Sequence, residues 1–309
     1  MIDLHCHILP ELDDGSQSLE ESLAMARMAV NSGVRAMAAT PHCMGERAEE
    51  VYGTWSLLRQ ALEEAGVPLK LYPGMEIFGT PDTARLLREG KLFTLNGSRY
   101  PLIEFAFQSS GEEETLILRS VCRAGFRPLV AHPERYTYLQ HDPEIVNRWC
   151  RLGCLFQVNR GSLLGRFGGH AQALAYALVE RGFAAAVASD AHSPRVRTPW
   201  MEDVRDLLAQ EFSPRCARAL LLDNQALPQR FDSPRLQDVY QRYIAPYGFP
   251  IAGFGELRLP SYRVSKGASE WEAFCGFSEG ALGVRPYLTP QGVIEPQRPS
   301  GGRRYTIGE

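Results

Sequence analysis

The sequence predicts an α/β fold with a parallel sheet over roughly its first two-thirds. Short apolar runs alternate there with longer amphipathic stretches, and a glycine follows most of those stretches. A short apolar run bounded by turn residues is typical of a strand buried on both faces, and strands that alternate with helices indicate βαβ units. The seven predicted strands are residues 2–6, 34–40, 69–72, 101–105, 128–131, 155–158 and 184–188.

The first amphipathic stretch carries both a start and a stop signal for a helix. Ser18 precedes it and Glu21 follows three positions later, which is the capping-box pattern, ahead of apolar residues at helical spacing. Gly33 is expected to end this helix, because glycine readily adopts the left-handed conformation that closes a helix. The same stop signal recurs at Gly66, Gly90, Gly125, Gly153 and Gly182.

Seven strand–helix units are compatible with a closed barrel or an open doubly wound sheet. In both arrangements the working face lies at the carboxyl ends of the strands. Two more helices are expected near residues 201–210 and 214–224. Beyond about residue 230 the pattern stops and Pro, Gly, Arg and Tyr become frequent. We therefore divide the chain into a domain of residues 1–229 and a C-terminal extension of residues 230–309, whose role is unknown.

Composition limits the classes of function. The chain has 309 residues, a formal net charge of -3 and a pI of about 6.2, so no global basic field points to nucleic acid. Its seven cysteines are odd in number and include no CxxC, which argues against a disulfide scaffold and for a reducing compartment. The N-terminus lacks a signal-peptide pattern, and no apolar run reaches transmembrane length. We expect a cytoplasmic protein without membrane insertion; the sequence does not indicate an oligomeric state.

Residues that bind metals sit at, or just after, the ends of the predicted strands. Five of the seven histidines share these positions, and the carboxylates occur with them. A lone His-x-His pair or a single buried glutamate has ordinary structural explanations, but the whole set at one predicted rim favours a metal site. The candidates are His5, His7, Asp13, Asp14, His42, Glu76, Glu104, His132, Asp190 and His192.

Imidazole and carboxylate ligands suit Mn, Fe or Zn, and a carboxylate can bridge neighbouring ions. Such a site lowers the pKa of water and clamps the attacking and leaving oxygens in phosphoryl transfer. A cysteine-dependent phosphatase is the competing chemistry, because Cys154 and Arg160 fit C-x5-R. That mechanism needs a glycine-rich phosphate loop, whereas the five residues between Cys154 and Arg160 contain no glycine and are predicted to form a strand. We therefore reject it.

These motifs together resemble the PHP (polymerase and histidinol phosphatase) superfamily. More narrowly, the chain is similar to the bacterial tyrosine-protein phosphatases of capsule and exopolysaccharide operons, over about residues 1–225. Four stretches carry the closer similarity: Met1 to Pro10 with Asp13-Asp14-Gly15, His132 to Tyr136, Gln157 to Leu163, and Ser189 to Arg197. Arg160 departs from the resemblance, because the family commonly has a small residue there, and we expect it to alter the pocket rim.

The resemblance implies a distorted seven-stranded β/α barrel that holds up to three metal ions, with Mn²⁺ expected and Fe or Zn as alternatives. It assigns His5, His7, Glu76 and Asp190 to one ion. Glu76 bridges to a second ion that Glu104 and His132 also bind, and Asp14, His42 and His192 bind the third. The resemblance implies phosphate-contacting arginines at Arg135 and Arg197, with Arg195 as a rival, and we count His42 with them as catalytic. A planar guanidinium suits phosphate oxygens.

Three functions follow as hypotheses. The first is a protein-tyrosine phosphatase whose substrate is the phosphotyrosine cluster of a bacterial tyrosine autokinase in polysaccharide export. The second is a small-molecule phosphatase that acts on histidinol phosphate or a nucleotide phosphate. The third is a non-catalytic, metal-stabilised scaffold, which the complete ligand set disfavours.

Overall fold

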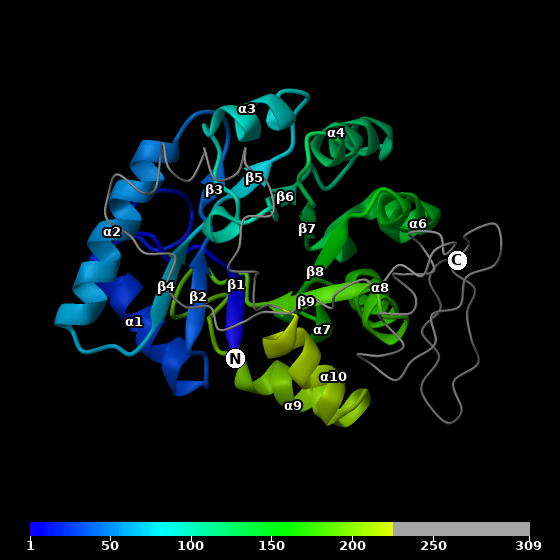
Figure 1. The fold of residues 1–309 in the computed structure, drawn as a ribbon. Coiled ribbons are helices and arrows are strands. Elements are labelled where there is room, and N and C mark those ends of the chain that lie inside the picture. Colours follow the sequence, from blue (N-terminus) through cyan, green and yellow to red (C-terminus); the bar gives the residue numbers. More distant parts are fainter. Residues whose placement is uncertain (225–309) are drawn as a thin grey trace.

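The computed structural model describes residues 1–224, which form two parallel sheets surrounded by helices (Figure 1). One sheet has the order β1-β2-β4, made of Ile2–Cys6, Ala36–Ala39 and Lys70–Pro73. The other has the order β3-β5-β6-β7-β8-β9. Its strands are His42–Cys43, Glu76–Phe78, Leu102–Glu104, Leu129–Ala131, Leu155–Asn159 and Ala184–Ala188. The predicted extension, 230–309, lies outside the described residues.

The α/β class and the parallel pairing are confirmed, but the described residues do not form a closed seven-stranded barrel. Each predicted strand is present within two residues of its expected bounds. Two of the seven strand paths are interrupted, at Thr40-Pro41 and at Gly74-Met75, and the chain continues beyond each break as a new strand, β3 or β5. Pro41 has no N–H to continue a ladder, although its carbonyl accepts a hydrogen bond from the Glu76 N–H at 3.0 Å.

The two sheets also meet beside β1 and β9. The His7 N–H donates to the Ala191 carbonyl at 2.8 Å, and the Asp190 N–H donates to the His5 carbonyl at 2.9 Å. An isolated parallel bridge pairs Cys6 with Ala191. These contacts bring the carboxyl end of β1 beside the carboxyl end of β9, although the two strands belong to different sheets.

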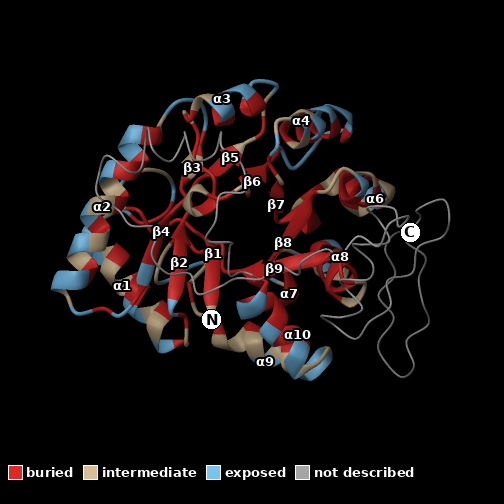
Figure 2. Cartoon of the chain, viewed as in Figure 1, coloured by how far each residue is buried: buried red, intermediate tan, exposed pale blue. Residues whose placement is uncertain are grey.

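Helices cover the outside of both sheets, and their outer faces carry most of the exposed residues in Figure 2. Among the described residues, none of these helices is long and apolar enough to cross a membrane. The longer ones are α1 (Leu19–Asn31), α2 (Ala48–Glu64), α4 (Glu112–Arg123), α8 (Gly169–Glu180) and α9 (Glu202–Glu211). The shorter ones are α3 (Thr83–Glu89), α5 (Thr137–His141), α6 (Glu144–Arg151), α7 (Arg160–Leu163), α10 (Pro214–Arg218) and the single turns η1 (Leu95–Gly97), η2 (Pro133–Arg135) and η3 (Ala219–Asp223).

The predicted signals of α1 are largely confirmed. The Ser18 hydroxyl accepts a hydrogen bond from the Glu21 N–H at 3.2 Å, a cap that contributes about 1 kcal/mol. The second hydrogen bond of the capping box differs from the usual pattern, because the Glu21 carboxylate accepts from the N–H of Gln17 and not from the N–H of Ser18. Gly33 ends the helix with a φ of 94°, and the five other predicted stop glycines also have positive φ. The predicted helix at 214–224 is divided into α10 and the π-turn η3.

Burial of the strands fixes where the site forms. Every residue of β1, β2, β8 and β9 is buried. Parallel strands that are buried on both faces have their carboxyl ends at the same edge of the sheet. The close-packed core holds these ends in fixed positions, so side chains placed there are held rigidly as well. The polar residues at that edge are the predicted metal-binding residues.

Candidate metal centre

The nine residues that the resemblance assigns to metal ions gather in one cluster. Their ligand atoms form four overlapping groups, each with all its atoms within 4.8 Å of one another. These groups are His7, Asp14, His42 and His192; His5, His7 and Asp190; His5, Glu76 and His132; and His42, Glu76 and Glu104.

The four residues that the resemblance assigns to the first ion lie close together around the two histidines at the end of β1. The Nε2 atoms of His5 and His7 lie 3.1 Å apart. Each lies 3.2 Å from Oε2 of Glu76 and 3.4 Å from Oδ1 of Asp190. All four side chains are buried, so four potential ligands converge on one enclosed point.

Glu76 is the central carboxylate of the cluster. Its Oε1 lies 2.8 Å from Nε2 of His132, and its Oε2 lies 3.0 Å from Nδ1 of His42. Glu104 approaches His42, with Oε1 at 2.6 Å from Nδ1, whereas the resemblance pairs Glu104 with His132. The division of the ligands among individual ions therefore remains a prediction.

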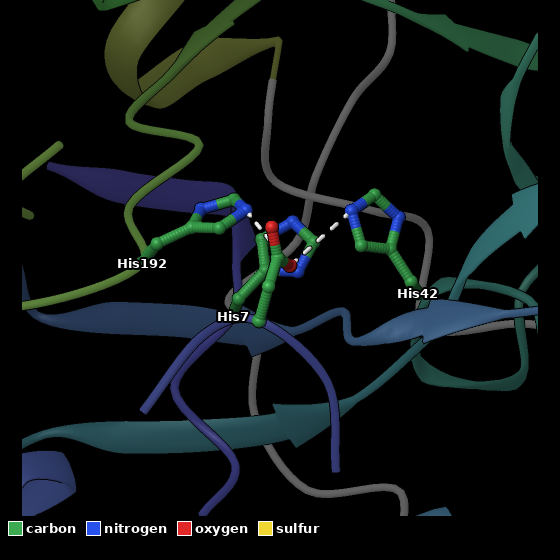
Figure 3. Close-up of side chains that lie close together, drawn as sticks. His7, His42 and His192 are labelled. Atoms are coloured by element: carbon green, nitrogen blue, oxygen red, sulfur yellow. Dashed lines mark ion pairs between the residues drawn. The ribbon is translucent and has the colours of Figure 1, made fainter. Parts of the chain in front are cut away.

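The third predicted set lies on the solvent side. Oδ1 of Asp14 is 3.5 Å from Nε2 of His42 and 3.4 Å from Nε2 of His192. Figure 3 shows the imidazoles of His7, His42 and His192 turned toward one another, with dashed lines for ion pairs. Asp14 is the most exposed member, with 66% of its side chain accessible, so this is where the cluster opens to solvent.

The donor atoms fit divalent cations. Oδ1 of Asp190 and Nε2 of His192 are buried and have no hydrogen-bond partner. Leaving a buried polar atom unsatisfied costs about 1–3 kcal/mol, so two such atoms aimed at one cluster indicate a bound cation. Neutral imidazole nitrogens and ionised carboxylates are the ligands of Mn, Fe and Zn.

A directed chain of hydrogen bonds orients His5. Asp190 accepts from the side-chain amide of Asn159, whose oxygen accepts from Nε2 of Gln157 at 2.8 Å. The Gln157 side-chain oxygen lies 2.8 Å from Nδ1 of His5, so that nitrogen donates and Nε2 faces the cluster. The sequence placed Gln157 and Asn159 in a stretch similar to the family, but it did not predict this orienting role. The signal was there, since Gln157 and Asn159 alternate on one face of a buried strand.

Asp13 is a second residue whose role sequence reasoning missed. Its Oδ2 lies 2.7 Å from Nδ1 of His7 and accepts from the His42 N–H at 2.7 Å, while its Oδ1 accepts from the Gly15 N–H at 2.9 Å. The ionised carboxylate only accepts, so Nδ1 of His7 donates and Nε2 faces the cluster. Asp13 thus orients a ligand, whereas Asp14 supplies one.

We expect Asp13→Asn to weaken metal binding by about 10- to 100-fold, because the amide accepts less strongly and no longer fixes the ring of His7. Competition of the loaded protein with a chelator measures this change. Asp82→Asn, which changes an exposed residue just before α3, is the control. An unchanged affinity in Asp13→Asn would show that His7 keeps its orientation without this carboxylate.

The two buried carboxylates are ionised. Burial alone would raise the pKa of Glu76, but the charge of His5 and the hydrogen bonds with His132 and His42 hold it well below its usual range. Burial also acts to raise the pKa of Asp190. The charge of His5 and the contacts of Asp190 with His7 and Arg197 outweigh burial and hold the pKa of Asp190 well below normal. Both carboxylates are therefore in the form that binds cations.

The histidines are divided between two protonation states. Burial, helped by the charge of His7, lowers the pKa of His192 to about 3, so this imidazole is neutral and ready to bind. Burial also disfavours charge on His42, but hydrogen bonds with Glu104 and Glu76 raise its pKa to about 10. Without metal, His42 therefore carries a proton at neutral pH.

Loading the centre with Mn²⁺ at pH 7.5 is expected to release protons, because His42 must lose its proton to bind an ion. Below about pH 6.5 this proton stabilises the metal-free fold, and that stability is lost as the pH rises toward 10. Metal affinity should therefore increase with pH over this window. Calorimetric titration in two buffers of different ionisation enthalpy counts the protons.

His42→Gln should release about one proton fewer per loaded protein. His141→Gln, which changes an exposed histidine at the end of α5, should release as many protons as the unaltered chain. Equal release from the His42 variant and the unaltered chain would contradict the protonation of His42.

Two arginines face Asp190 at the edge of the cluster. Nη1 of Arg135 lies 3.1 Å from Oδ2 of Asp190, and Arg197 makes an ion pair with the same oxygen. Arg197 is held in its loop because its carbonyl accepts from the His192 N–H at 2.9 Å, whereas Arg195 is exposed. This geometry favours Arg197 over Arg195 as the second phosphate-contacting residue.

The backbone is strained where these side chains are presented. His132, Asp190 and Arg197 have φ values of 33°, 50° and 52°, in the region that favours glycine. Such conformations persist when surrounding contacts enforce them, and they concentrate at functional sites.

Arg160 does not line the pocket rim as expected. Its side chain is 3% exposed and binds Asp203 through both Nε and Nη2, and its Nη1 donates to the Thr198 carbonyl at 3.1 Å. It ties α7 to α9 and to the loop that carries Arg197. Cys154, the other end of the C-x5-R pattern, is buried, and burial raises the pKa of its thiol well above normal, which agrees with rejecting a cysteine nucleophile.

The chain is similar to a known protein family over the residues that form this site. The family described as capsular polysaccharide synthesis, CpsB/CapC, matches residues 1–227. The tyrosine-protein phosphatase YwqE of Bacillus subtilis is 34% identical over 216 residues, 69% of this chain and 85% of YwqE. The tyrosine-protein phosphatase CpsB of Streptococcus pneumoniae is 32% identical over 233 residues, 72% of this chain and 96% of CpsB.

A solved structure supports the same relationship. It comes from work on YwqE of Bacillus subtilis and CpsB of Streptococcus pneumoniae, described as unique metal-dependent tyrosine phosphatases. It superposes with a TM-score of 0.69 and 32% identity, over 74% of this chain and 94% of the other. The resemblance inferred from the motifs is thereby confirmed, and the chain belongs to the CpsB/CapC family of capsular polysaccharide synthesis.

Proposed function

We propose that the protein is a metal-dependent protein-tyrosine phosphatase. One observation supports the proposal: nine predicted metal ligands and two arginines lie together at one rim, in a chain whose relatives are named tyrosine-protein phosphatases. The match to the family covers all of the elements that form this rim. We propose Mn²⁺ as the metal, with up to three ions held by the nine residues.

Each part of the cluster has a distinct task in this proposal. A divalent cation bound there acts as a Lewis acid on a phosphoryl oxygen and lowers the pKa of water. His5, His7, Glu76 and Asp190 would hold one ion, Glu104 and His132 would hold a second together with Glu76, and Asp14, His42 and His192 would hold a third. Arg135 and Arg197 bind the equatorial phosphoryl oxygens and stabilise the charge that builds up on them. Asp190 contacts both guanidinium groups, which keeps them aimed at the site.

We propose the phosphotyrosine cluster of a bacterial tyrosine autokinase in polysaccharide export as the substrate. The support is the family's role in capsular polysaccharide synthesis together with the names of the relatives. The cytoplasm is the proposed location. None of the six cysteines in the described part of the chain forms a disulfide, as expected in a reducing compartment.

Initial-rate phosphate release tests the function. The Mn²⁺-loaded chain is given a phosphotyrosine peptide, a phosphoserine peptide, histidinol phosphate and a nucleoside 3′,5′-bisphosphate, with His132→Ala as the control variant. We expect a clear preference for phosphotyrosine that is lost in the variant. Preference for a small molecule would replace the proposal with a small-molecule phosphatase, and bound metal without any turnover would replace it with the scaffold.

A further inference from the structure

Two phenylalanine rings contact the guanidinium group of Arg135. Its Cζ lies 4.6 Å from the centroid of the Phe107 ring and 4.4 Å from the centroid of the Phe167 ring. Cζ of Arg197 lies 5.9 Å from the Phe167 ring as well. A cation within about 6 Å of an aromatic centroid is attracted to the ring, so both phosphate-contacting arginines share one aromatic support.

The backbone leaves a place for the Phe167 ring. Phe167 follows α7 in the segment before α8, and its ring packs on Gly161 in the first turn of α7. A Cβ on Gly161 would lie 2.6 Å from Cε2 of Phe167 and 3.1 Å from Cζ, which is too close. A glycine at this position is therefore what allows the ring to reach Arg135.

Phe107 is held in a different way and stays accessible. It follows β6, and its carbonyl accepts hydrogen bonds from both the N–H and the hydroxyl of Thr137, each at 2.9 Å. Its ring lies 6.0 Å from the ring of His132 and 6.1 Å from that of Tyr136. Even so, 43% of the residue is exposed. A single exposed apolar side chain is ordinary, but this one is anchored beside both a predicted ligand and a predicted phosphate-binding group.

We propose that Phe107 and Phe167 select aryl phosphate monoesters: Phe167 positions Arg135 and Arg197 for the phosphoryl group, and the exposed face of Phe107 binds the phenyl ring of the substrate. This inference rests on the proposed phosphatase function and names the chemical class that the site prefers. The phosphoryl group and the ring of phosphotyrosine are adjacent in one molecule, as are Arg135 and Phe107 in the site. A phosphoserine side chain has no ring to bury on Phe107, so it gains nothing there.

Phenylphosphonate and methylphosphonate separate the two roles, because they share the anionic head and differ in the ring. Binding of each to the full, Mn²⁺-loaded chain is measured by calorimetry. We expect phenylphosphonate to bind about tenfold more tightly than methylphosphonate, as expected for partial burial of an aromatic ring. Phe107→Ala should weaken methylphosphonate modestly, because Arg135 loses one of its two ring contacts. It should weaken phenylphosphonate about tenfold more than methylphosphonate, so that most of the ratio is lost, and Phe107→Tyr should retain the ratio. Leu116→Ala, an exposed apolar residue of α4, is the matched control.

The Phe167 variants test positioning. Phe167→Leu should weaken both phosphonates by a similar factor, about tenfold, since Arg135 loses its support, and Phe167→Tyr should restore binding. An unchanged phenyl-to-methyl ratio in Phe107→Ala, or equal weakening of both ligands there, would overturn the ring-binding role. Full binding by Phe167→Leu would overturn the positioning role. These ratios are read without turnover, so failure of the inference and failure of the phosphatase function are distinguishable.

Discussion

Glu76→Gln is expected to lower the rate of phosphotyrosine hydrolysis by about 10³-fold and to remove most of the bound metal. The Glu76 oxygens lie 2.8–3.2 Å from nitrogens of His5, His7, His42 and His132. A neutral amide has one acceptor oxygen and cannot bridge cations as a carboxylate does. Loss of the cations would remove several kcal/mol of transition-state stabilisation, which corresponds to the expected factor. The measurements are metal content per chain and initial rate with a phosphotyrosine peptide.

Glu114→Gln is the matched control for this change. Glu114 is also a buried glutamate, 7% exposed, with one oxygen that has no hydrogen-bond partner, but it lies on α4. We expect metal content and rate in this variant to match the unaltered chain. A similar loss in both variants would mean that changing any buried carboxylate damages the fold, and Glu76 would then have no special role.

The second large effect is expected from Arg197→Ala, which should reduce kcat/KM for the same peptide by about 10²- to 10³-fold. The side chain of Arg197 is 28% exposed and its guanidinium already contacts Asp190 at the site, so it needs little rearrangement to bind a phosphoryl group. Metal content should be unchanged, because no predicted metal ligand is removed. Steady-state kinetics combined with metal analysis separates this loss from that in Glu76→Gln.

Arg195→Ala decides between the two arginines of this loop. Arg195 is exposed, and the main-chain bond that positions Arg197 does not involve its side chain. We expect its kinetics to equal those of the unaltered chain. A larger loss of kcat/KM in Arg195→Ala than in Arg197→Ala would show that Arg195, and not Arg197, contacts the substrate.

The parts of the fold that the sequence predicted well are those set by local pattern. Alternating apolar runs identified all seven strand paths, and glycines with positive φ identified helix ends. The breaks at Thr40-Pro41 and Gly74-Met75 were missed because they depend on how two neighbouring strands pair after each break. That pairing joins His42 to Glu76 in register, which no one-dimensional pattern encodes.

The candidate site likewise contains residues that the sequence predicted and residues that it did not predict. Residue type and position at strand ends identified ten candidate ligands, because parallel strands end at a common edge. The family resemblance reduced them to the nine predicted ligands by preferring Asp14 to Asp13. Asp13, Gln157 and Asn159 were missed as orienting residues, since their importance lies in which nitrogen of a histidine they contact. Arg160 was misjudged because its partner Asp203 is distant in sequence and on another helix.

The separation into two sheets gives the cations a mechanical role. His5 and His7 belong to the end of the β1 sheet, whereas Glu76, His132 and Asp190 are carried by the other sheet. An ion held by residues of both sheets would cross-link them, as a disulfide cross-links two segments of a chain. Metal loading should therefore raise the free energy of unfolding of residues 1–224, because the cations bind the folded arrangement of both sheets and not the unfolded chain.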